Sequence, residues 1–97
     1  MFSISRNDKG DVVVTGRFDA SRVDEASAVL DAVTETCRVD MAQLDYISSA
    51  GLGVLLKAQK RLNDAGHGLI LVNTGKMVRD VFKIARFDLV FQMVEDP

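Results

Sequence analysis

The sequence predicts one α/β domain with a mostly parallel or mixed sheet, and three observations indicate it. β-rich runs alternate with segments of helical periodicity in the order ββαβαβαβ. The segment 69–72 is continuously apolar, as in a strand covered on both faces. Residues 1–97 contain no repeat, linker or low-complexity stretch, and a chain of this length makes a single domain. Connections between such strands cross over right-handedly and leave the helices packed on the sheet.

The first elements are a hairpin and a helix. Residues 2–6 alternate at period two and residues 12–15 are β-rich, so the polar link between them predicts a hairpin. Gly16 is expected to end the second strand. Asp19 and Ser21 are alternative caps for the helix that follows. The apolar stripe of this helix, which extends to about residue 34, comprises Val23, Ala26, Leu30 and Val33.

A third strand and the longest helix come next. Residues 37–41 alternate, and a short link joins them to the extended segment 44–47. The helix is expected over about residues 50–65, with Gly66 as its terminator. The expected inner face is Gly51, Leu55, Ala58, Leu62 and Ala65, and the expected solvent face is Lys57, Lys60, Arg61 and Asp64.

The chain ends with a third helix and a short strand. Asn73 or Thr74 is expected to cap the helix. Two adjacent apolar stripes lie on it, Met77, Val81 and Ile84 on one and Val78, Phe82 and Ala85 on the other. We expect Met77 in the core, together with Met93 from a final strand within residues 87–93.

Composition excludes several classes of function. Twelve basic and 14 acidic side chains give a net charge of −2 without any basic block, which argues against a nucleic-acid partner. The single Cys37 forms no internal disulfide and is typical of a reducing compartment. The N-terminus lacks a signal-peptide core, and no apolar run is long enough to cross a membrane. A cytoplasmic module without direct membrane insertion is therefore expected.

The segment 44–56 is the candidate functional stretch. An extended apolar run leads into Ser48 and Ser49, and Gly51 and Gly53 follow as the long helix begins. The first N–H groups of a helix lack partners within the helix, and with the helix dipole they favour a nearby anion. A phosphate on Ser48 or Ser49 would lie where the backbone favours negative charge. The alternative is that these serines only cap the helix.

No catalytic or metal site emerges from the motifs. An acyl-transfer nucleophile at Ser49 needs a Gly-x-Ser-x-Gly elbow, but residue 47 is Ile47. The only histidine, His67, is expected at the far end of the helix that Ser49 begins, about 24 Å away. One Cys and one His without clustered carboxylates make no zinc site, and the glycines match neither a Walker loop nor a dinucleotide fingerprint. We expect a protein that is not an enzyme and binds no metal or cofactor.

Three landmarks at preserved spacing resemble the STAS family. They are Gly16-Arg17-Phe18-Asp19, Leu44-Asp45-Tyr46-Ile47-Ser48-Ser49-Ala50-Gly51-Leu52-Gly53 and Val78-Arg79-Asp80-Val81-Phe82-Lys83-Ile84. Within the family, the chain most resembles the stand-alone anti-sigma factor antagonists (anti-anti-sigma factors) of bacteria. The resemblance covers nearly all of residues 1–97. It implies a four-to-five-stranded mixed sheet with three main helices packed on one face.

The resemblance also implies a function in partner switching. Such proteins bind a GHKL-type serine kinase that is itself an anti-sigma factor, which releases the sigma factor and regulates transcription. Phosphorylation of one Ser or Thr by that kinase switches them off, and a serine phosphatase resets them. The chain is then expected to be a monomer when free.

Residue by residue, the family's phosphoacceptor corresponds to Ser49, two positions before the first glycine of Gly-Leu-Gly. The preceding residue is usually Asp in the family but is Ser48 here, which makes Ser48 the alternative acceptor. Asp19 matches an acidic position beside the site. The family often has Gly where this chain has Arg86, and a left-handed Arg86 would cost about 1 kcal/mol. The implied partner-binding residues are Asp19, Ser48, Ser49, Ala50, Gly51, Leu52, Gly53 and Val54.

Other functions keep the same fold. Related domains are non-catalytic subunits of lipid-transport ABC complexes, where the same junction docks onto an ATPase without phosphorylation, and Ser48 in place of Asp leaves room for this function. Another relay, with an output other than transcription, is also open. A nucleotide-binding module is a third possibility, although Tyr46 is the only aromatic residue near the junction.

Overall fold

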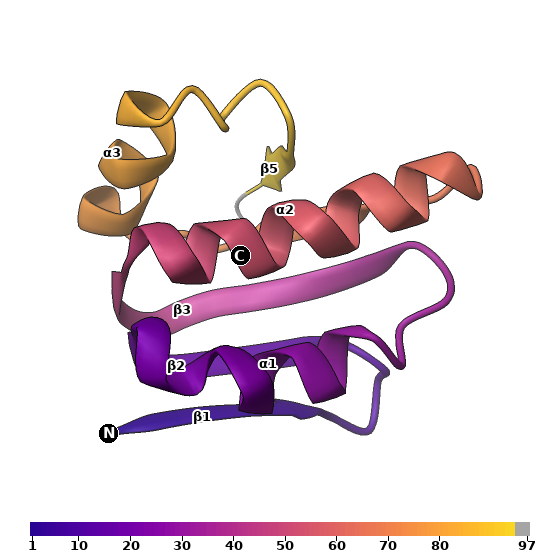
Figure 1. Cartoon of the computed structure of the whole chain (residues 1–97), viewed down its shortest axis with the longest axis horizontal. Helices are drawn as coiled ribbons and strands as arrows, with labels where there is room; N and C mark the ends of the chain where they lie inside the picture. Colours follow the sequence, from indigo (N-terminus) through magenta and orange to yellow (C-terminus); the bar gives the residue numbers. More distant parts are fainter. Residues whose placement is uncertain (95–97) are drawn as a thin grey trace.

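The computed structural model describes residues 1–94 of the chain. Five strands and three α-helices follow one another, with a 3-10 turn before the first helix (Figure 1). In chain order they are β1 (Phe2–Arg6), β2 (Val12–Phe18), η1 (Ala20–Arg22), α1 (Val23–Leu30), β3 (Cys37–Ile47), α2 (Ser49–Asp64), β4 (Leu69–Val72), α3 (Lys76–Ile84) and β5 (Gln92–Val94). The predicted order ββαβαβαβ is confirmed.

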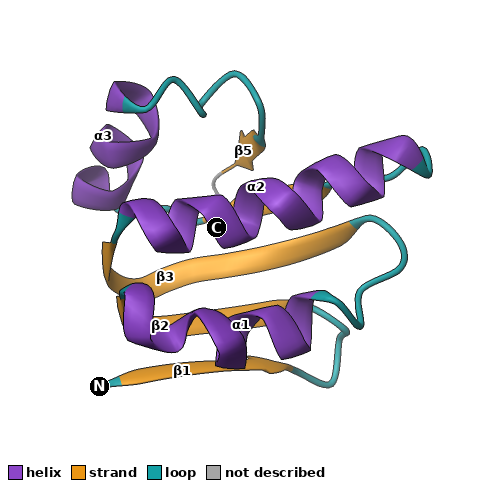
Figure 2. Ribbon diagram, in the orientation of Figure 1, coloured by secondary structure: helices purple, strands orange, loops and turns teal. Residues whose placement is uncertain are grey.

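The sheet is mixed, with spatial order β1-β2-β3-β4-β5. β1 pairs with β2 antiparallel, and every later pair is parallel. The three parallel connections all advance in the same direction across the sheet, so right-handed crossovers place α1, α2 and α3 on one face. Figure 2 shows α1 and α2 lying along that face. The predicted mixed sheet with three helices on one face is confirmed.

The core lies between that sheet face and the helices. Largest among the fully buried side chains are Phe18, Phe82, Leu30, Met41, Leu55 and Leu62, contributed by every layer of the fold. Two polar side chains, Gln59 and Arg61, fasten α2 over this core. Gln59 is buried; its amide oxygen accepts from the Leu69 N–H (2.6 Å) and its amide nitrogen donates to the Val90 carbonyl (2.9 Å). Arg61, predicted on the solvent face, is exposed, yet its guanidinium donates to the carbonyls of Leu30 and Val33 and so caps the end of α1.

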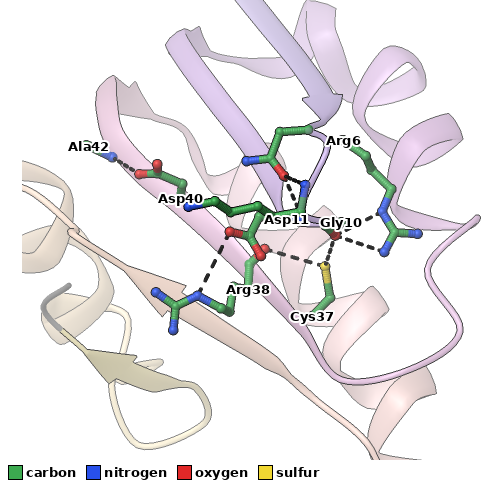
Figure 3. Close-up of polar contacts among 9 residues, drawn as sticks. Arg6, Gly10, Asp11, Cys37, Arg38, Asp40 and Ala42 are labelled. Carbon is green, nitrogen blue, oxygen red and sulfur yellow. Dashed lines mark hydrogen bonds and ion pairs between the residues drawn. The ribbon is translucent and has the colours of Figure 1, made fainter.

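Polar contacts close the β1–β2 hairpin against the start of β3 (Figure 3). The Gly10 carbonyl, in a turn where Gly10 has φ of 84°, accepts from the Arg6 guanidinium at 2.9 and 3.1 Å. The thiol of the buried Cys37 reaches the same carbonyl at 3.5 Å. On β3 the Arg38 guanidinium pairs with the Asp11 carboxylate at 4.0 Å. The predicted hairpin is confirmed, and its turn is tied to the neighbouring strand.

β2 does not end at Gly16, contrary to the prediction. Gly16 stays inside the strand with φ of 83°, and the ladder to β3 shifts register directly after it. A Cβ at this position would lie 1.8 Å from the Met1 carbonyl oxygen, and the Arg17 N–H donates to that same oxygen at 2.9 Å. Glycine is therefore required by the close approach of the N-terminal residue, and the strand continues to Phe18.

β3 is one strand, whereas the sequence predicted two extended segments joined by a link. The residue pairs that flank its two register shifts are Val13 with Asp40 and Thr15 with Gln43, then Gly16 with Leu44 and Arg17 with Tyr46. Each shift inserts one extra residue into β3, as in a β-bulge. The Asp40 carboxylate accepts from the Ala42 N–H (3.0 Å) at the first shift (Figure 3). After it, β3 buries every third residue, namely Met41, Leu44 and Ile47, which is why a period-two pattern failed there.

The C-terminal third departs most from prediction. Met77 is 76% exposed, so its expected place in the core is wrong, whereas Met93 is half-buried against the core. Gly75, not Asn73 or Thr74, occupies the N-cap of α3. The last strand is confined to Gln92–Val94.

The first two helices also differ from prediction at their C-terminal ends. Ala65, predicted on the inner face of the longest helix, is exposed, because α2 ends at Asp64. α1 ends at Leu30, earlier than the expected end near residue 34.

Arg86 keeps the left-handed conformation anticipated for it, with φ of 63°. Its N–H donates to the Lys83 carbonyl at 3.0 Å, just beyond the end of α3. A left-handed conformation that glycine adopts without strain is thus adopted here by an arginine, at the strain cost of a non-glycine residue.

Candidate functional site

Ser48 joins the end of β3 to the start of α2 and fixes both. Its N–H donates to the Phe18 carbonyl at the end of β2 (2.9 Å), and its carbonyl accepts the first helical bond from Leu52 (2.9 Å). Its side-chain oxygen accepts from the Gly51 N–H at 3.2 Å, with φ of −90° and ψ of 172°. This is N-cap geometry, in which one otherwise unpaired donor of the first turn is satisfied. The capping role that the sequence left open between the two serines belongs to Ser48.

Ser49 is the first residue of α2 and is exposed. Within residues 1–94 its hydroxyl has no hydrogen-bond partner, and it takes no part in the cap made by Ser48. The hydroxyl stands at a helix N-terminus, where free N–H groups and the helix dipole favour negative charge. The two adjacent serines therefore differ: one is committed to the fold and the other is available to solvent.

The two glycines after the serines are required for different reasons. A Cβ on Gly51 would lie 2.9 Å from Ile47 Cγ1 and 3.0 Å from the Phe18 carbonyl oxygen, so only glycine lets the first turn of α2 rest on the strand ends. A Cβ on Gly53 would meet nothing within 4 Å, and Gly53 is exposed. Gly51 therefore serves the packing of the helix, whereas Gly53 leaves a flat spot on its outer surface.

Three of the predicted contact residues are buried, namely Gly51, Leu52 and Val54. Leu52 is 5% exposed and Val54 is 9% exposed, and both belong to the hydrophobic core. They are buried because the first two turns of α2 face the sheet through them as well as through Leu55. The predicted set therefore divides into core members and a small surface of Ser48, Ser49, Ala50 and Gly53, which we call the serine junction.

Asp19 lies next to this junction along β2, since it follows Phe18, whose carbonyl holds Ser48. One Asp19 carboxylate oxygen accepts from both the N–H and the hydroxyl of Ser21, at 3.0 and 2.6 Å, and caps the 3-10 turn. The hydrogen bond from the Ser21 hydroxyl is the largest cause that lowers the pKa of Asp19, and the nearby charge of Arg17 also contributes. A carboxylate thus stands at the carboxyl end of β2, directly after the Phe18 carbonyl that holds Ser48.

A cation–π pair flanks the junction and was missed by sequence reasoning. The Arg17 guanidinium lies 4.1 Å from the centroid of the Tyr46 ring, and the two residues are register partners on β2 and β3. Both are exposed at the end of the sheet where β3 leads into Ser48. Their spacing in the sequence gives no signal of this contact, because the second bulge of β3 sets the register that brings them together.

His67 lies at the other end of α2, just after the helix ends. The helix has 16 residues, which places His67 about 24 Å from Ser49. The His67 ring is 3.4 Å from the Thr36 hydroxyl and lines a polar hollow of about 350 Å³ together with Gln59, Asn63 and Gln92. The separation of Ser49 and His67 that argued against a catalytic triad is therefore a feature of the fold.

No described helix has the length and apolar character needed to cross a bilayer. Residues 1–94 likewise bring together no group of three or more His, Cys, Asp or Glu side chains that could hold a metal ion.

The solved structures that share this fold include proteins named as anti-sigma factor antagonists. A structure of an anti-sigma factor antagonist from Thermotoga maritima aligns over 99% of this chain and 87% of its own, with a TM-score of 0.78 and 16% identity. SpoIIAA of Bacillus in its phosphorylated form aligns over 100% of this chain and 92% of its own, with a TM-score of 0.72 and 23% identity. At these identities the likeness shows the shared fold.

Sequence comparison identifies the family. BtrV of Bordetella bronchiseptica, which carries the name of an anti-sigma factor antagonist, is 39% identical over 67 residues. The match covers 69% of this chain and spans 58% of the length of BtrV. The family model described as Mlab, STAS domain matches residues 2–95. The chain therefore belongs to the STAS domain family.

Proposed function

We propose that this chain is an anti-sigma factor antagonist that binds a kinase-type anti-sigma factor and is switched off by phosphorylation of Ser49. The observation that carries the proposal is the exposed Ser49 hydroxyl at the start of α2, beside a cap already provided by Ser48. The name of BtrV and the fold shared with SpoIIAA, solved both with and without its phosphate, support it. In this proposal the chain is a cytoplasmic binding module, not an enzyme, and a serine phosphatase resets it.

The unmodified serine junction suits close approach by a partner. Its exposed residues are small and uncharged, and Gly53 leaves open space of at least 4 Å around its missing Cβ. A partner's backbone can therefore come near the start of α2 without displacing side chains. Asp19, beside the serine junction, supplies the negative charge that Ser48 cannot supply.

Phosphorylation of Ser49 changes the free energy of partner binding more than the free energy of unfolding of the chain. It adds about 1.5 to 2 negative charges. The helix N-terminus stabilises an anion by roughly 0.3–2 kcal/mol, and the Ser48 cap stays in place because Ser49 takes no part in it. In the complex, an unpaired dianion buried against the partner costs several kcal/mol, and each 1.4 kcal/mol is about tenfold in affinity. The modified chain stays folded and loses its partner.

Phosphosite mapping tests the acceptor. The chain is incubated with ATP and a purified GHKL-type anti-sigma kinase from the same organism, and modified residues are located by tandem mass spectrometry. We expect one phosphate on Ser49, none in Ser49→Ala, and retained phosphorylation in the matched control Ser48→Ala. That control loses the cap and about 1 kcal/mol of stability. Phosphate on Ser48, or undiminished phosphorylation of Ser49→Ala, contradicts the assignment.

A second candidate function is a non-catalytic subunit that docks onto an ABC ATPase. The observation that favours it is Ser48, which stands where phosphorylated members usually have a carboxylate. Its hydroxyl oxygen accepts a hydrogen bond from the Gly51 N–H. This function needs the serine junction but no phosphate. Stable binding to a purified ABC ATPase, unchanged by ATP-dependent modification, would favour it over the switch.

A further inference from the structure

The serine junction by itself is a poor anchor for a protein partner. A stable interface buries roughly 800 Å² on each side, and its affinity is concentrated in a few large apolar or aromatic side chains. The exposed residues of the junction are small. Leu52 and Val54, which were predicted to help, lie in the core, and the alternative to Leu52, the nearby Leu56, is half-buried. A kinase that binds here must find its apolar contacts on neighbouring elements.

Few exposed residues can supply such contacts. Among residues 1–94 the exposed large apolar side chains are Met1, Tyr46, Met77, Ile84, Leu89 and Val90. Tyr46 and Met77 stand apart from the others because they line one shallow hollow, of about 30 Å³, with Asp45, Ile47, Val78 and Val81. Ile47 is the residue immediately before Ser48, so the hollow adjoins the serine junction.

α3 has a wider apolar surface than its packing uses. Val78 and Phe82 are buried in the core, and this is the stripe that holds the helix on the sheet. The neighbouring stripe begins at Met77, 76% exposed, continues through the half-buried Val81 and ends at Ile84, 83% exposed. α3 packs against β3, the strand whose last residue, Ile47, precedes Ser48, and in the view of Figure 1 it lies above the start of α2. Exposed apolar side chains gathered on one helix face suit a contact with a protein partner.

Tyr46 is also held in position before any partner arrives. The Arg17 guanidinium lies over its ring at 4.1 Å, and the ring is 37% exposed at the edge of the hollow. A ring already ordered in the free protein loses little conformational entropy on binding, which is the property expected of an anchor.

We infer that Tyr46 and Met77 form the apolar anchor of the kinase-binding surface, with an apolar side chain of the kinase packed against both of them over the shallow hollow between β3 and α3. This inference rests on the proposed function and names the part of the chain that provides the affinity. The serine junction then provides the switch, because a phosphate on Ser49 lies at the margin of an apolar contact that excludes water. Separate residues carry binding and its control.

A matched pair of charge insertions tests the anchor. Met77→Glu and Leu89→Glu each place a carboxylate at a highly exposed apolar position, 76% and 87% exposed, but Leu89 lies outside the hollow. Affinity for the purified kinase that phosphorylates Ser49 is measured by titration calorimetry with the unphosphorylated chain. We expect Met77→Glu to weaken binding by about tenfold or more and Leu89→Glu to stay within about threefold of the unsubstituted chain. Both variants should melt as the parent does, since neither side chain is in the core.

The outcomes separate this inference from the proposed function. If the kinase modifies Ser49 and binds Met77→Glu as tightly as the unsubstituted chain, the anchor is wrong and the function stands. Equal weakening by Leu89→Glu also overturns the anchor, because the effect is then one of charge alone. If sedimentation shows the chain to be a dimer that Met77→Glu dissociates, the occupant of the hollow is a second copy, not the kinase. If no such kinase binds or modifies the chain, the function fails and the inference fails with it.

Discussion

The neighbouring glycines of α2 give the sharpest test of the local packing. In Gly51→Ala the new methyl would sit 2.9 Å from Ile47 Cγ1, 3.0 Å from the Phe18 carbonyl oxygen and 3.1 Å from the Phe18 ring. Overpacking of this kind costs about 1–3 kcal/mol, against a gain of up to about 1 kcal/mol from replacing glycine in a helix. In Gly53→Ala the methyl meets nothing within 4 Å, so only the gain remains. The two variants should therefore differ by about 1–3 kcal/mol, with Gly53→Ala the more stable.

Urea unfolding of both variants, followed by circular dichroism, measures this difference directly. For a domain of 97 residues, 1 kcal/mol corresponds to about 4–8 °C in Tm, so thermal melting gives an independent check. The parent chain should lie between the variants or close to Gly53→Ala. Equal stability of the two variants would refute the reasoning, because it would mean that α2 does not press on the ends of β2 and β3 at Gly51.

Three further substitutions test other parts of the fold. Gln59→Leu leaves the buried Leu69 N–H without its 2.6 Å acceptor and should lower the free energy of unfolding by about 1–3 kcal/mol in urea titrations; no loss would show that water replaces the amide. Arg86→Gly removes the strain of a φ of 63° and should raise stability by about 1 kcal/mol; a lower Tm would contradict this. Because its folded pKa lies below the ordinary value of 3.8, Asp19 contributes stability above that pH which is lost as the pH falls through the folded pKa. Asp19→Asn should therefore make the free energy of unfolding depend less steeply on pH in the acid range. An unchanged slope would show that the Ser21 hydrogen bond to Asp19 is not the source of this pH dependence.

Hydrophobic periodicity was sufficient to predict the order and type of the elements. It failed in β3 because two extra residues shift the pattern from every second to every third position, and bulges have no strong local signal. It also failed for Met77, since the two apolar stripes of α3 look alike in the sequence and only packing decides that Val78 and Phe82 face the sheet. In such cases tertiary packing selects among patterns that are locally equivalent.

The sequence predicted that each helix start has a capping residue, but not always which residue provides the cap. Thr74 was an expected cap, yet its hydroxyl is buried and donates to the Met41 sulfur at 3.8 Å, so the helix start moves to Gly75. At the candidate site, two adjacent serines before a helix were visible in the sequence. Which of them caps depends on the bond from the Ser48 N–H to the Phe18 carbonyl, a contact between distant segments that no local rule contains.

The most direct test of the central claim compares the affinity of the kinase for the chain before and after phosphorylation of Ser49, alongside the melting temperature of both forms. A buried, unpaired phosphate costs several kcal/mol, so affinity should fall by about two to three orders of magnitude. The melting temperature should change little, because the cap made by Ser48 and Gly51 is untouched. Equal affinity of the two forms, or loss of the fold together with loss of binding, would contradict the account.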